Sequence, residues 1–398
     1  MTMELLAPAG NLEKLKYAIW YGADAVYCAY RAFSLRAAGG NFDEAQLQEA
    51  IAFCKAHGKK LYLAVNIYPT EEDLAALPAF LEWVEQLKPD GMIIADLGIL
   101  RLAKRYAPSV PIHISTQANI TNYEAAMAYH ELGASRLVLA RETTLEQIRA
   151  IGQKIPSSLE LECFVHGAMC ISYSGRCLLS AAMTGRSANR GACAHPCRWS
   201  YSLMEEQRPG EYFPIEEDER GTYLMNSKDL CLMPYLKELS EAGVKSLKIE
   251  GRMKSFYYAA CTTRAYRLAL DDLAAGKPFD PALLEELKAV SHRDYTTGFF
   301  FGAPEEAALN PFDSGYRRST DVVAVADDQQ GWLIQKNKFI AGEPLWVLSP
   351  GRAPEPITFS AMRDEAGNPI DAAPHAQMRV QIEQSLPAHS IIRREHEE

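Results

Sequence analysis

The sequence contains no run of 18 consecutive apolar residues, the length that a membrane-spanning helix requires. Its first residues, MTMELLAPAGN, lack the basic stretch followed by an apolar segment that marks a secretion signal. Internal repeats and low-complexity tracts are absent as well. We therefore expect a globular cytoplasmic protein with no membrane partner. Because thiols stay reduced in the cytoplasm, its nine cysteines should serve metal or redox chemistry rather than structural disulfides.

Basic residues are in the minority, since 41 lysines and arginines face 51 aspartates and glutamates, a formal net charge of −10. An acidic total disfavours a nucleic-acid partner, but the local distribution of charge matters more. From Cys163 to Met204 there is no acidic residue at all. This stretch carries four arginines: Arg176, Arg186, Arg190 and Arg198. Two roles are open to them, pairing with acids elsewhere such as the IEEDER run at 215–220, or facing an anionic substrate.

Eight short apolar runs alternate with amphipathic segments over the first 255 residues. The runs cover 4–7, 25–29, 60–66, 91–96, 111–115, 136–140, 159–165 and 246–250. Segments between them, such as NLEKLKYAIWYG and NYEAAMAYHELG, close on a glycine, where helices commonly end. Such alternation predicts an α/β fold with a parallel sheet buried on both faces. Eight strands are the number that closes a (β/α)8 TIM-type barrel.

One connection in this pattern is far longer than the others, because about 80 residues separate the seventh predicted strand from the eighth. Loops that follow barrel strands lie at the C-terminal face, where active sites are found. Two more helices, over 255–276 and 280–291, follow the eighth strand. From Ser319 onward short alternating runs separated by turn signals predict a small antiparallel β-barrel. The expected divisions are a barrel domain (1–300) with a cysteine-rich insertion (166–245), a linker (301–318) and a C-terminal β-barrel domain (319–398).

The insertion begins with a concentration of cysteine in CFVHGAMCISYSGRCLLSAAMTGRSANRGACAHPCRWS. Four cysteines are spaced as Cys170-x6-Cys177-x15-Cys193-x3-Cys197, which fits the thiolate ligands of a 4Fe–4S cluster. Zinc usually takes tighter CxxC pairs, and a single nucleophilic thiol would leave three cysteines without a role. Both alternatives stay open, as does Cys231 as a rival fourth ligand. Small buried hydrophobes are expected at the remaining strand and helix positions: Cys28, Cys54 and Cys163.

Polar residues collect where the predicted strands end. In a barrel these ends converge on one mouth, so the side chains should meet there. They are Asn66, Asp96, Ser115, Gln117, Arg141, Glu142, Glu162, His166, Lys248, Glu250 and Arg252. A lone histidine or glutamate at such a position can be merely structural, but His166 lies only four residues before Cys170. Lys248 and Glu250 alternate onto one strand face and should point into the barrel, as an ion pair or as substrate contacts.

Several runs resemble one family, in their residues and in their order along the chain. FVHGAMCISYSGRCLLS, LAPAGNLEKLKYAIWYGADAVY, RGACAHPCRW, NSKDL and KIEGRMKS are similar to the collagenase-like peptidase family U-32, of unknown catalytic type. The resemblance covers nearly the whole chain. It implies an iron–sulfur cluster on Cys170, Cys177, Cys193 and Cys197. Single-barrel members with a C-terminal β-domain are implicated in making 5-hydroxyuridine at the wobble position of tRNA, with prephenate as the required metabolite.

The resemblance makes the tRNA anticodon arm and prephenate the expected partners. Relatives that hydroxylate 23S rRNA cytidine or ubiquinone leave the substrate open. Our candidate catalytic residues are Glu162, His166, Lys248 and Glu250, and our candidate substrate contacts are Tyr173, Arg176, Arg198, Asn226, Lys228 and Arg252. The family name suggests a peptidase instead, but the sequence has neither a GxSxG elbow nor an HExxH helix. Thiols bound to iron also cannot act as free nucleophiles.

Overall fold

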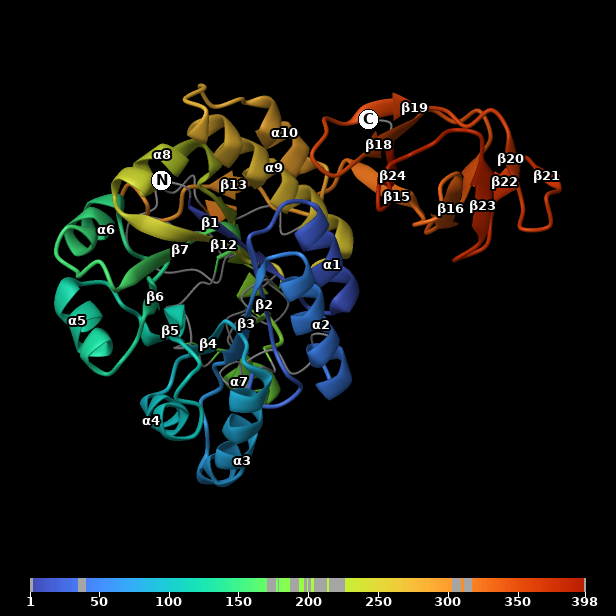
Figure 1. Cartoon of the computed structure of the whole chain (residues 1–398). Coiled ribbons are helices and arrows are strands. Elements are labelled where there is room, and N and C mark those ends of the chain that lie inside the picture. The colour runs from blue at the N-terminus through green and yellow to red at the C-terminus, as the bar shows by residue number, and fades with distance from the viewer. Residues whose placement is uncertain are drawn as a thin grey trace.

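The computed structural model describes residues 3–34, 41–169, 177, 179–186, 193–196, 199, 202–203, 213–214, 226–302, 309–310 and 317–396. At its centre is a closed barrel of eight parallel strands (Figure 1). The strands are β1 (Glu4–Pro8), β2 (Ala25–Cys28), β3 (Lys60–Val65), β4 (Gly91–Ile94), β5 (Ile112–Ile114), β6 (Arg136–Val138), β7 (Glu160–Ala168) and β12 (Val244–Ile249). The barrel closes because β12 pairs with both β7 and β1. The predicted TIM-type barrel is confirmed, and all eight predicted strands are present.

The helices around the barrel begin at side chains that cap their first turn. They are α1 (Leu12–Trp20), α2 (Glu44–Ala56), α3 (Glu71–Leu87), α4 (Leu97–Tyr106), α5 (Tyr123–Glu131) and α6 (Leu145–Gly152). Each has an Asn, Asp or Thr whose side chain accepts a backbone N–H of the first turn. Asp96, expected at the mouth, is one of these caps. None of the helices in the described part of the chain is long and apolar enough to cross a bilayer.

Two short strands extend the barrel wall beyond the predicted eight. β11 (Asp229–Cys231) pairs antiparallel with the last residues of β7, and β13 (Tyr295–Thr296) pairs with β11. The 3-10 helix η4 (Met233–Tyr235) and the helix α8 (Leu236–Glu241) then lead into β12. β11 therefore joins the sheet of the barrel, although its residues fall within the expected insertion, 166–245. The remaining described elements of the insertion are α7 (Leu179–Thr184), β8 (Ser202–Leu203), β9 (Phe213–Pro214) and β10 (Asn226–Ser227), the last paired with β14 (Leu309–Asn310).

The helices α9 (Phe256–Ala274) and α10 (Ala282–Lys288) lead to an antiparallel domain with its own core. Its sheet has the order β19-β18-β24-β15-β16-β23-β20-β21, and β17 pairs with β22. The bounds are β15 (Thr320–Ala326), β16 (Trp332–Gln335), β17 (Phe339–Ile340), β18 (Leu345–Leu348), β19 (Glu355–Ile357), β20 (Met362–Arg363), β21 (Pro369–Ile370), β22 (Ala372–Ala373), β23 (Arg379–Ile382) and β24 (Ile391–Glu395). The predicted antiparallel C-terminal domain is confirmed, as a curled sheet.

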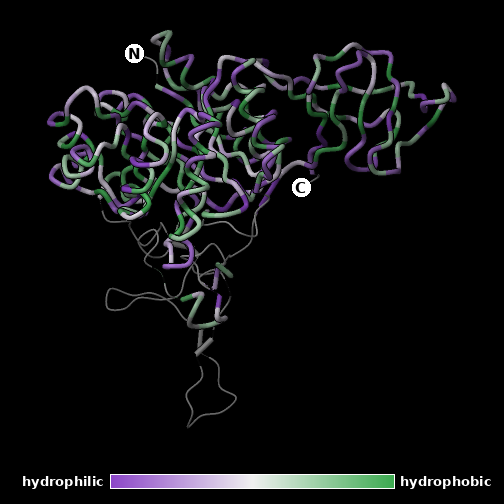
Figure 2. Tube along the Cα trace, turned by 60° about the horizontal axis from the view of Figure 1, so that its bottom comes forward, coloured by the Kyte–Doolittle hydropathy of each residue, from purple (hydrophilic) through white to green (hydrophobic). Residues whose placement is uncertain are grey.

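The C-terminal domain lies beside the barrel, on the side of α1 and α9 (Figure 1). Figure 2 shows the same side-by-side arrangement from another direction. The hydroxyl of Tyr21 donates to the carbonyl oxygens of Leu348 (2.7 Å) and His389 (3.0 Å). The ring of His389 also stacks on Trp20, with centroids 3.3 Å apart. The Arg393 guanidinium reaches Glu286 of α10 at 3.2 Å. Buried hydrogen bonds and apolar contacts thus join the two domains.

Candidate active site

Arg141 ties together three strand ends at the barrel mouth. It follows β6, and its Nη1 donates to the carbonyl oxygen of Ala168 at the end of β7 (2.7 Å). Its Nη2 lies 3.2 Å from Oε2 of Glu250, just past β12. The guanidinium also lies 4.0 Å from the ring centroid of Phe164. Arg141 and Glu250 therefore meet at the barrel mouth, as predicted. The Arg141 side chain is 8% exposed there.

Glycines allow the loop after β12 to pack closely against its neighbours. A Cβ on Gly10 would lie 2.1 Å from the carbonyl oxygen of Arg252. Gly167 has φ +103°, and a Cβ there would lie 2.7 Å from the carbonyl oxygen of Glu250. The Tyr258 hydroxyl donates to that same oxygen at 2.9 Å. The loop that carries Glu250 and the buried Arg252 is therefore held from three sides.

Two of the candidate catalytic residues form a buried ion pair with each other. Lys248 Nζ lies 2.8 Å from Oε1 of Glu162, and the exposed fractions of these residues are 3% and 0%. Oε2 of Glu162 accepts from Arg136 at 3.2 Å. Lys248 is also 4.5 Å from the ring centroid of Tyr27. Of the two roles expected for Lys248 and Glu250, an ion pair with each other is not formed, because Lys248 pairs with Glu162 and Glu250 pairs with Arg141. Their role as substrate contacts stays a prediction.

Arg136 and Glu4, which our sequence reasoning missed, complete this interior network. Both are first residues of strands, so they lie toward the amino-terminal end of the barrel. Arg136 Nη1 is 2.6 Å from Glu4 Oε1, and Nη2 is 2.7 Å from Glu160 Oε2. Burial opposes ionisation of Glu4, but Arg136 outweighs it and lowers the pKa of this carboxyl. A charge at the start of an apolar strand was the signal available, and its position favours stability over catalysis.

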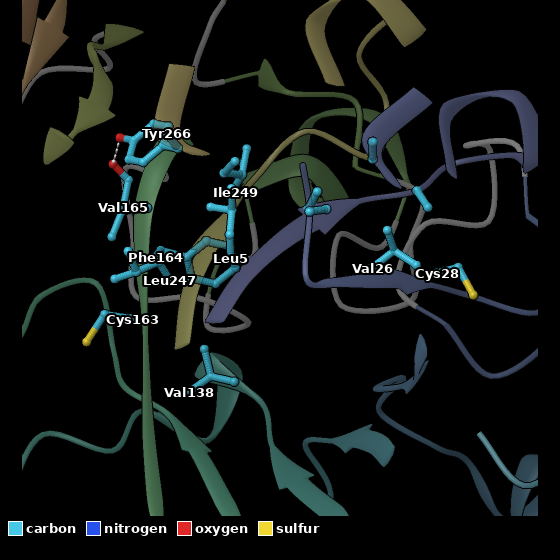
Figure 3. Packing of buried hydrophobic residues seen from close by; sticks show 14 of the residues in the cluster. Leu5, Val26, Cys28, Val138, Cys163, Phe164, Val165, Leu247, Ile249 and Tyr266 are labelled. Carbon is cyan, nitrogen blue, oxygen red and sulfur yellow. Dashed lines mark hydrogen bonds between the residues drawn. The ribbon is translucent and has the colours of Figure 1, made fainter. Parts of the chain in front are cut away.

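His166 lies outside the barrel lumen, although we expected it at the mouth. The β7–β12 register shifts at this point, with Lys248 opposite Phe164 but Ile249 opposite His166. Figure 3 shows Tyr266 of α9 beside β7, donating to the carbonyl oxygen of Val165 at 2.7 Å. The His166 ring is within 6.0 Å of the rings of Tyr258, Tyr266 and Tyr295. Burial lowers the pKa of His166 to about 3, so the neutral imidazole is the form that packs here.

This buried histidine makes stability depend on acid pH. An unfolded histidine titrates near 6.5, so below that pH the unfolded chain binds a proton that folded His166 does not. The free energy of unfolding should fall by up to about 1.4 kcal/mol per pH unit from this residue as the pH drops. Urea unfolding of His166→Asn should show a shallower slope between pH 6 and 4.5. The matched control is His57→Asn at an exposed helix end, and equal slopes for parent and His166→Asn would contradict the assignment.

A cluster of amides and hydroxyls lies on the opposite side of the mouth, after β3 and β5. Asn66 Nδ2 donates to Gln117 Oε1 at 2.8 Å, and Ser115 Oγ donates to the same oxygen at 3.2 Å. Gln117 belongs to the 3-10 helix η1 (Thr116–Ala118) and is 6% exposed. The hydroxyl of Tyr68 donates to the backbone oxygen of Gln117 at 3.3 Å. The expected convergence of Asn66, Ser115 and Gln117 is therefore seen.

The described cysteines fall into two groups. Five are buried, with thiol pKa values raised by burial: Cys28, Cys54, Cys163, Cys231 and Cys261. Cys28 and Cys163 pack in the core (Figure 3), as expected. Cys231 lies 3.8 Å from the Tyr266 hydroxyl, an environment that disfavours it as a ligand. Cys177 and Cys193 are only partly buried, and the Cys193 sulfur accepts the backbone N–H of His195 at 3.4 Å.

The proposed cluster ligands are described only in part. Cys170 and Cys197 lie outside the described residues, as do the candidate substrate contacts Tyr173, Arg176 and Arg198 and the acidic run 215–220. Within the described ranges no three His, Cys, Asp or Glu side chains come together as a metal site. Lys228 is partly exposed between β10 and β11, and Asn226 belongs to β10. Arg186 is exposed at the end of α7. Thiol chemistry and accessibility make Cys177 and Cys193 suitable for a cluster.

A closed (β/α)8 barrel with a cysteine-rich insertion after β7 and an antiparallel C-terminal domain defines the class of protein. Residues 10–310 match the model of "Peptidase family U32", and residues 318–393 match "Peptidase family U32 C-terminal domain". The chain belongs to peptidase family U32.

Curated relatives match most of this chain in sequence. The chain is 39% identical to "tRNA hydroxylation protein P" of Escherichia coli, over 93% of this chain and 91% of that protein. It is 38% identical to "tRNA hydroxylation protein P1" of Bacillus subtilis, over 94% of this chain and 89% of that protein. It is also 32% identical to a protein of Porphyromonas gingivalis named "Collagenase", over 79% and 77% respectively.

Proposed function

We propose that this chain is a tRNA-modifying enzyme that hydroxylates the wobble uridine to 5-hydroxyuridine, with prephenate as co-substrate and a 4Fe–4S cluster as cofactor. The observation that carries the proposal is the 39% identity, over nine-tenths of both chains, to a protein named for tRNA hydroxylation. A cytoplasmic location follows from such a substrate. The target base must be unstacked from the anticodon loop for C5 to come within reach of a barrel mouth.

The residues of the mouth suit this task by their chemistry. The ligands for the cluster would be Cys170, Cys177, Cys193 and Cys197, and a bound cluster would supply one-electron redox chemistry. Arg141 donates to the carbonyl oxygen of Ala168, at the end of β7 from which the insertion departs, and pairs with Glu250 after β12. The buried guanidinium of Arg252 sits in the same loop as Glu250 and is suited to a carboxylate of prephenate. Lys248 and Glu162 form an ion pair with each other, so their role would be structural, below the site in the barrel interior.

Mass spectrometry of tRNA nucleosides tests the proposal. A strain lacking this gene, and lacking any parallel route to the same modification, should contain no 5-hydroxyuridine-derived nucleosides, and expression of the chain should restore them. A strain that keeps these species would contradict the proposal. Loss of a modified cytidine from 23S rRNA, with tRNA unchanged, would redirect the activity to ribosomal RNA.

The cofactor assignment has its own measurement. Protein purified without oxygen should contain iron and acid-labile sulfide in equal amounts, near four of each per chain for this cluster type. Cys177→Ser should lower both, whereas Cys54→Ser, in the buried core, should not. Stoichiometric zinc in a colourless protein would overturn the assignment.

A peptidase is the second candidate, favoured by the family name and by the relative named "Collagenase". It requires a nucleophile or an activated water beside the substrate. Five of the described thiols are buried with raised pKa values, which makes them poor nucleophiles. Pure protein should therefore leave gelatin intact. Cleavage that persists in the absence of iron and stops on thiol alkylation would establish the peptidase instead.

A further inference from the structure

In the side-chain amide of Gln117, the oxygen accepts two hydrogen bonds, whereas the nitrogen donates none to a described residue. Oε1 accepts hydrogen bonds from Asn66 Nδ2 (2.8 Å) and Ser115 Oγ (3.2 Å), which occupy both lone pairs. These bonds fix the amide plane and decide which end is the nitrogen. No described residue provides an acceptor for Nε2, and the residue as a whole is 6% exposed. Gln117 thus presents hydrogen-bond donors, and no free acceptor, at the barrel mouth.

The backbone around Gln117 is held in place before any ligand arrives. Tyr68 Oη and Asn119 Nδ2 both donate to the Gln117 carbonyl oxygen at 3.3 Å. The hydroxyl of Thr116 donates to the carbonyl oxygen of Leu139 at 3.0 Å, which joins η1 to the end of β6. A donor held in this way loses little conformational entropy on binding. The Tyr68 hydrogen bond also holds its aromatic ring next to the amide, where the ring suits base stacking.

Resting on the proposed function, we propose that Gln117 is the residue that distinguishes uridine from cytidine, by donating from Nε2 to O4 of the target base. Uracil carries an acceptor at C4, whereas cytosine carries an amino donor there. C4 is the ring neighbour of C5, the atom to be hydroxylated, so O4 lies on the edge of the base that faces the reacting site. O2 lies on the far side of the ring, and both bases share it.

A donor that faces the amino group of cytosine would lose its hydrogen bond and leave two buried donors opposed. Discrimination by one such contact is worth roughly 5- to 150-fold in affinity. Gln117→Glu inverts the contact with little other change. A carboxylate oxygen can still accept from Asn66 and Ser115, but the group at the position of Nε2 becomes an acceptor.

The experiment measures binding of two anticodon stem-loops, with U34 or C34, to anaerobically purified full-length protein. Hydroxylation of full-length tRNA carrying either base is measured alongside. Gln117→Glu should weaken binding of the U34 loop about tenfold and strengthen or preserve binding of the C34 loop. Gln48→Glu, on an exposed face of α2, makes the same charge change and should leave both affinities as in the parent. Tyr68→Leu should weaken both loops alike, because stacking is tolerant of base identity.

Gln117→Met is the second variant, and it removes the donor without introducing a charge into a buried position. It should reduce the preference for U34 and leave the C34 loop unaffected. An unchanged U34-to-C34 ratio in a folded Gln117→Glu or Gln117→Met protein would overturn the assignment, as would an equal loss for both bases. If the parent protein fails to hydroxylate tRNA at all, the proposed function itself fails. If the parent is active and the ratio is unchanged, only the role of Gln117 is refuted.

Discussion

Arg136→Met is expected to lower the free energy of unfolding by about 3–5 kcal/mol, the usual cost of removing one partner from a buried ion-pair network. The guanidinium is 3% exposed and contacts three carboxylates, on Glu4, Glu160 and Glu162. Without it, Glu162 keeps only Lys248 as a charged partner. Methionine preserves most of the volume, so the loss reports uncompensated charge rather than a cavity.

Urea unfolding followed by circular dichroism measures this loss. Arg101→Met, on an exposed position of α4, is the matched control and should change stability by less than about 0.5 kcal/mol. Adding Glu162→Gln to Arg136→Met should cost less than the sum of the two single changes, because the second change removes a charge that the first left unpaired. A loss below about 1 kcal/mol in Arg136→Met would show that solvent reaches the network.

Gly10→Ala should reduce tRNA hydroxylation about a hundredfold while the protein stays folded. The new Cβ would lie 2.1 Å from the carbonyl oxygen of Arg252, and that oxygen belongs to backbone that must move. The loop that moves carries Glu250, the partner of Arg141 at the mouth. Displacements near 1 Å at a reacting site cost about 100-fold in rate.

Modified nucleosides in a complemented deletion strain measure this effect, with thermal unfolding as the check on folding. Gly276→Ala is the control, since it makes the same chemical change at the end of α9, where a Cβ meets nothing within 4 Å. Its left-handed φ of +69° costs about 1 kcal/mol of stability, and activity should stay at the parent level. Full activity in Gly10→Ala would mean that the position of this loop does not matter for the reaction.

The barrel could be predicted from sequence because each strand is an apolar run of the right length followed by a capped helix. Val26, Leu63 and Ile94 face the helices and alternate with lumen-facing neighbours, so local pattern and global fold agree. β11 escaped prediction because three residues inside a long connection carry no periodic signal. Its existence depends on pairing with Gly167 and His166, far away in sequence.

The sequence predicted which residues lie at the site better than it predicted which of them contact one another. Strand ends located Arg141, Glu250, Asn66 and Gln117 at the mouth, because topology alone brings such ends together. The partner of Lys248 was mistaken because strand alternation tells which face a residue takes, but not which of several carboxylates lies within reach. The position of His166 depends on the second of two register shifts between β7 and β12, which no local pattern encodes.

The interface between the domains joins the end of the first helix to β18 and to the residue His389 just before the last strand. Tyr21 directly follows α1, yet its hydroxyl donates to the carbonyl oxygens of Leu348 and His389, which lie 327 and 368 residues further along the chain. During synthesis this side of α1 therefore stays exposed to solvent until almost the whole chain has left the ribosome. Loss of the final ten residues would remove β24, which pairs with both β15 and β18. A ribosome that stops just short of the end would release a barrel with one side unfinished, a form that quality-control proteases can recognise.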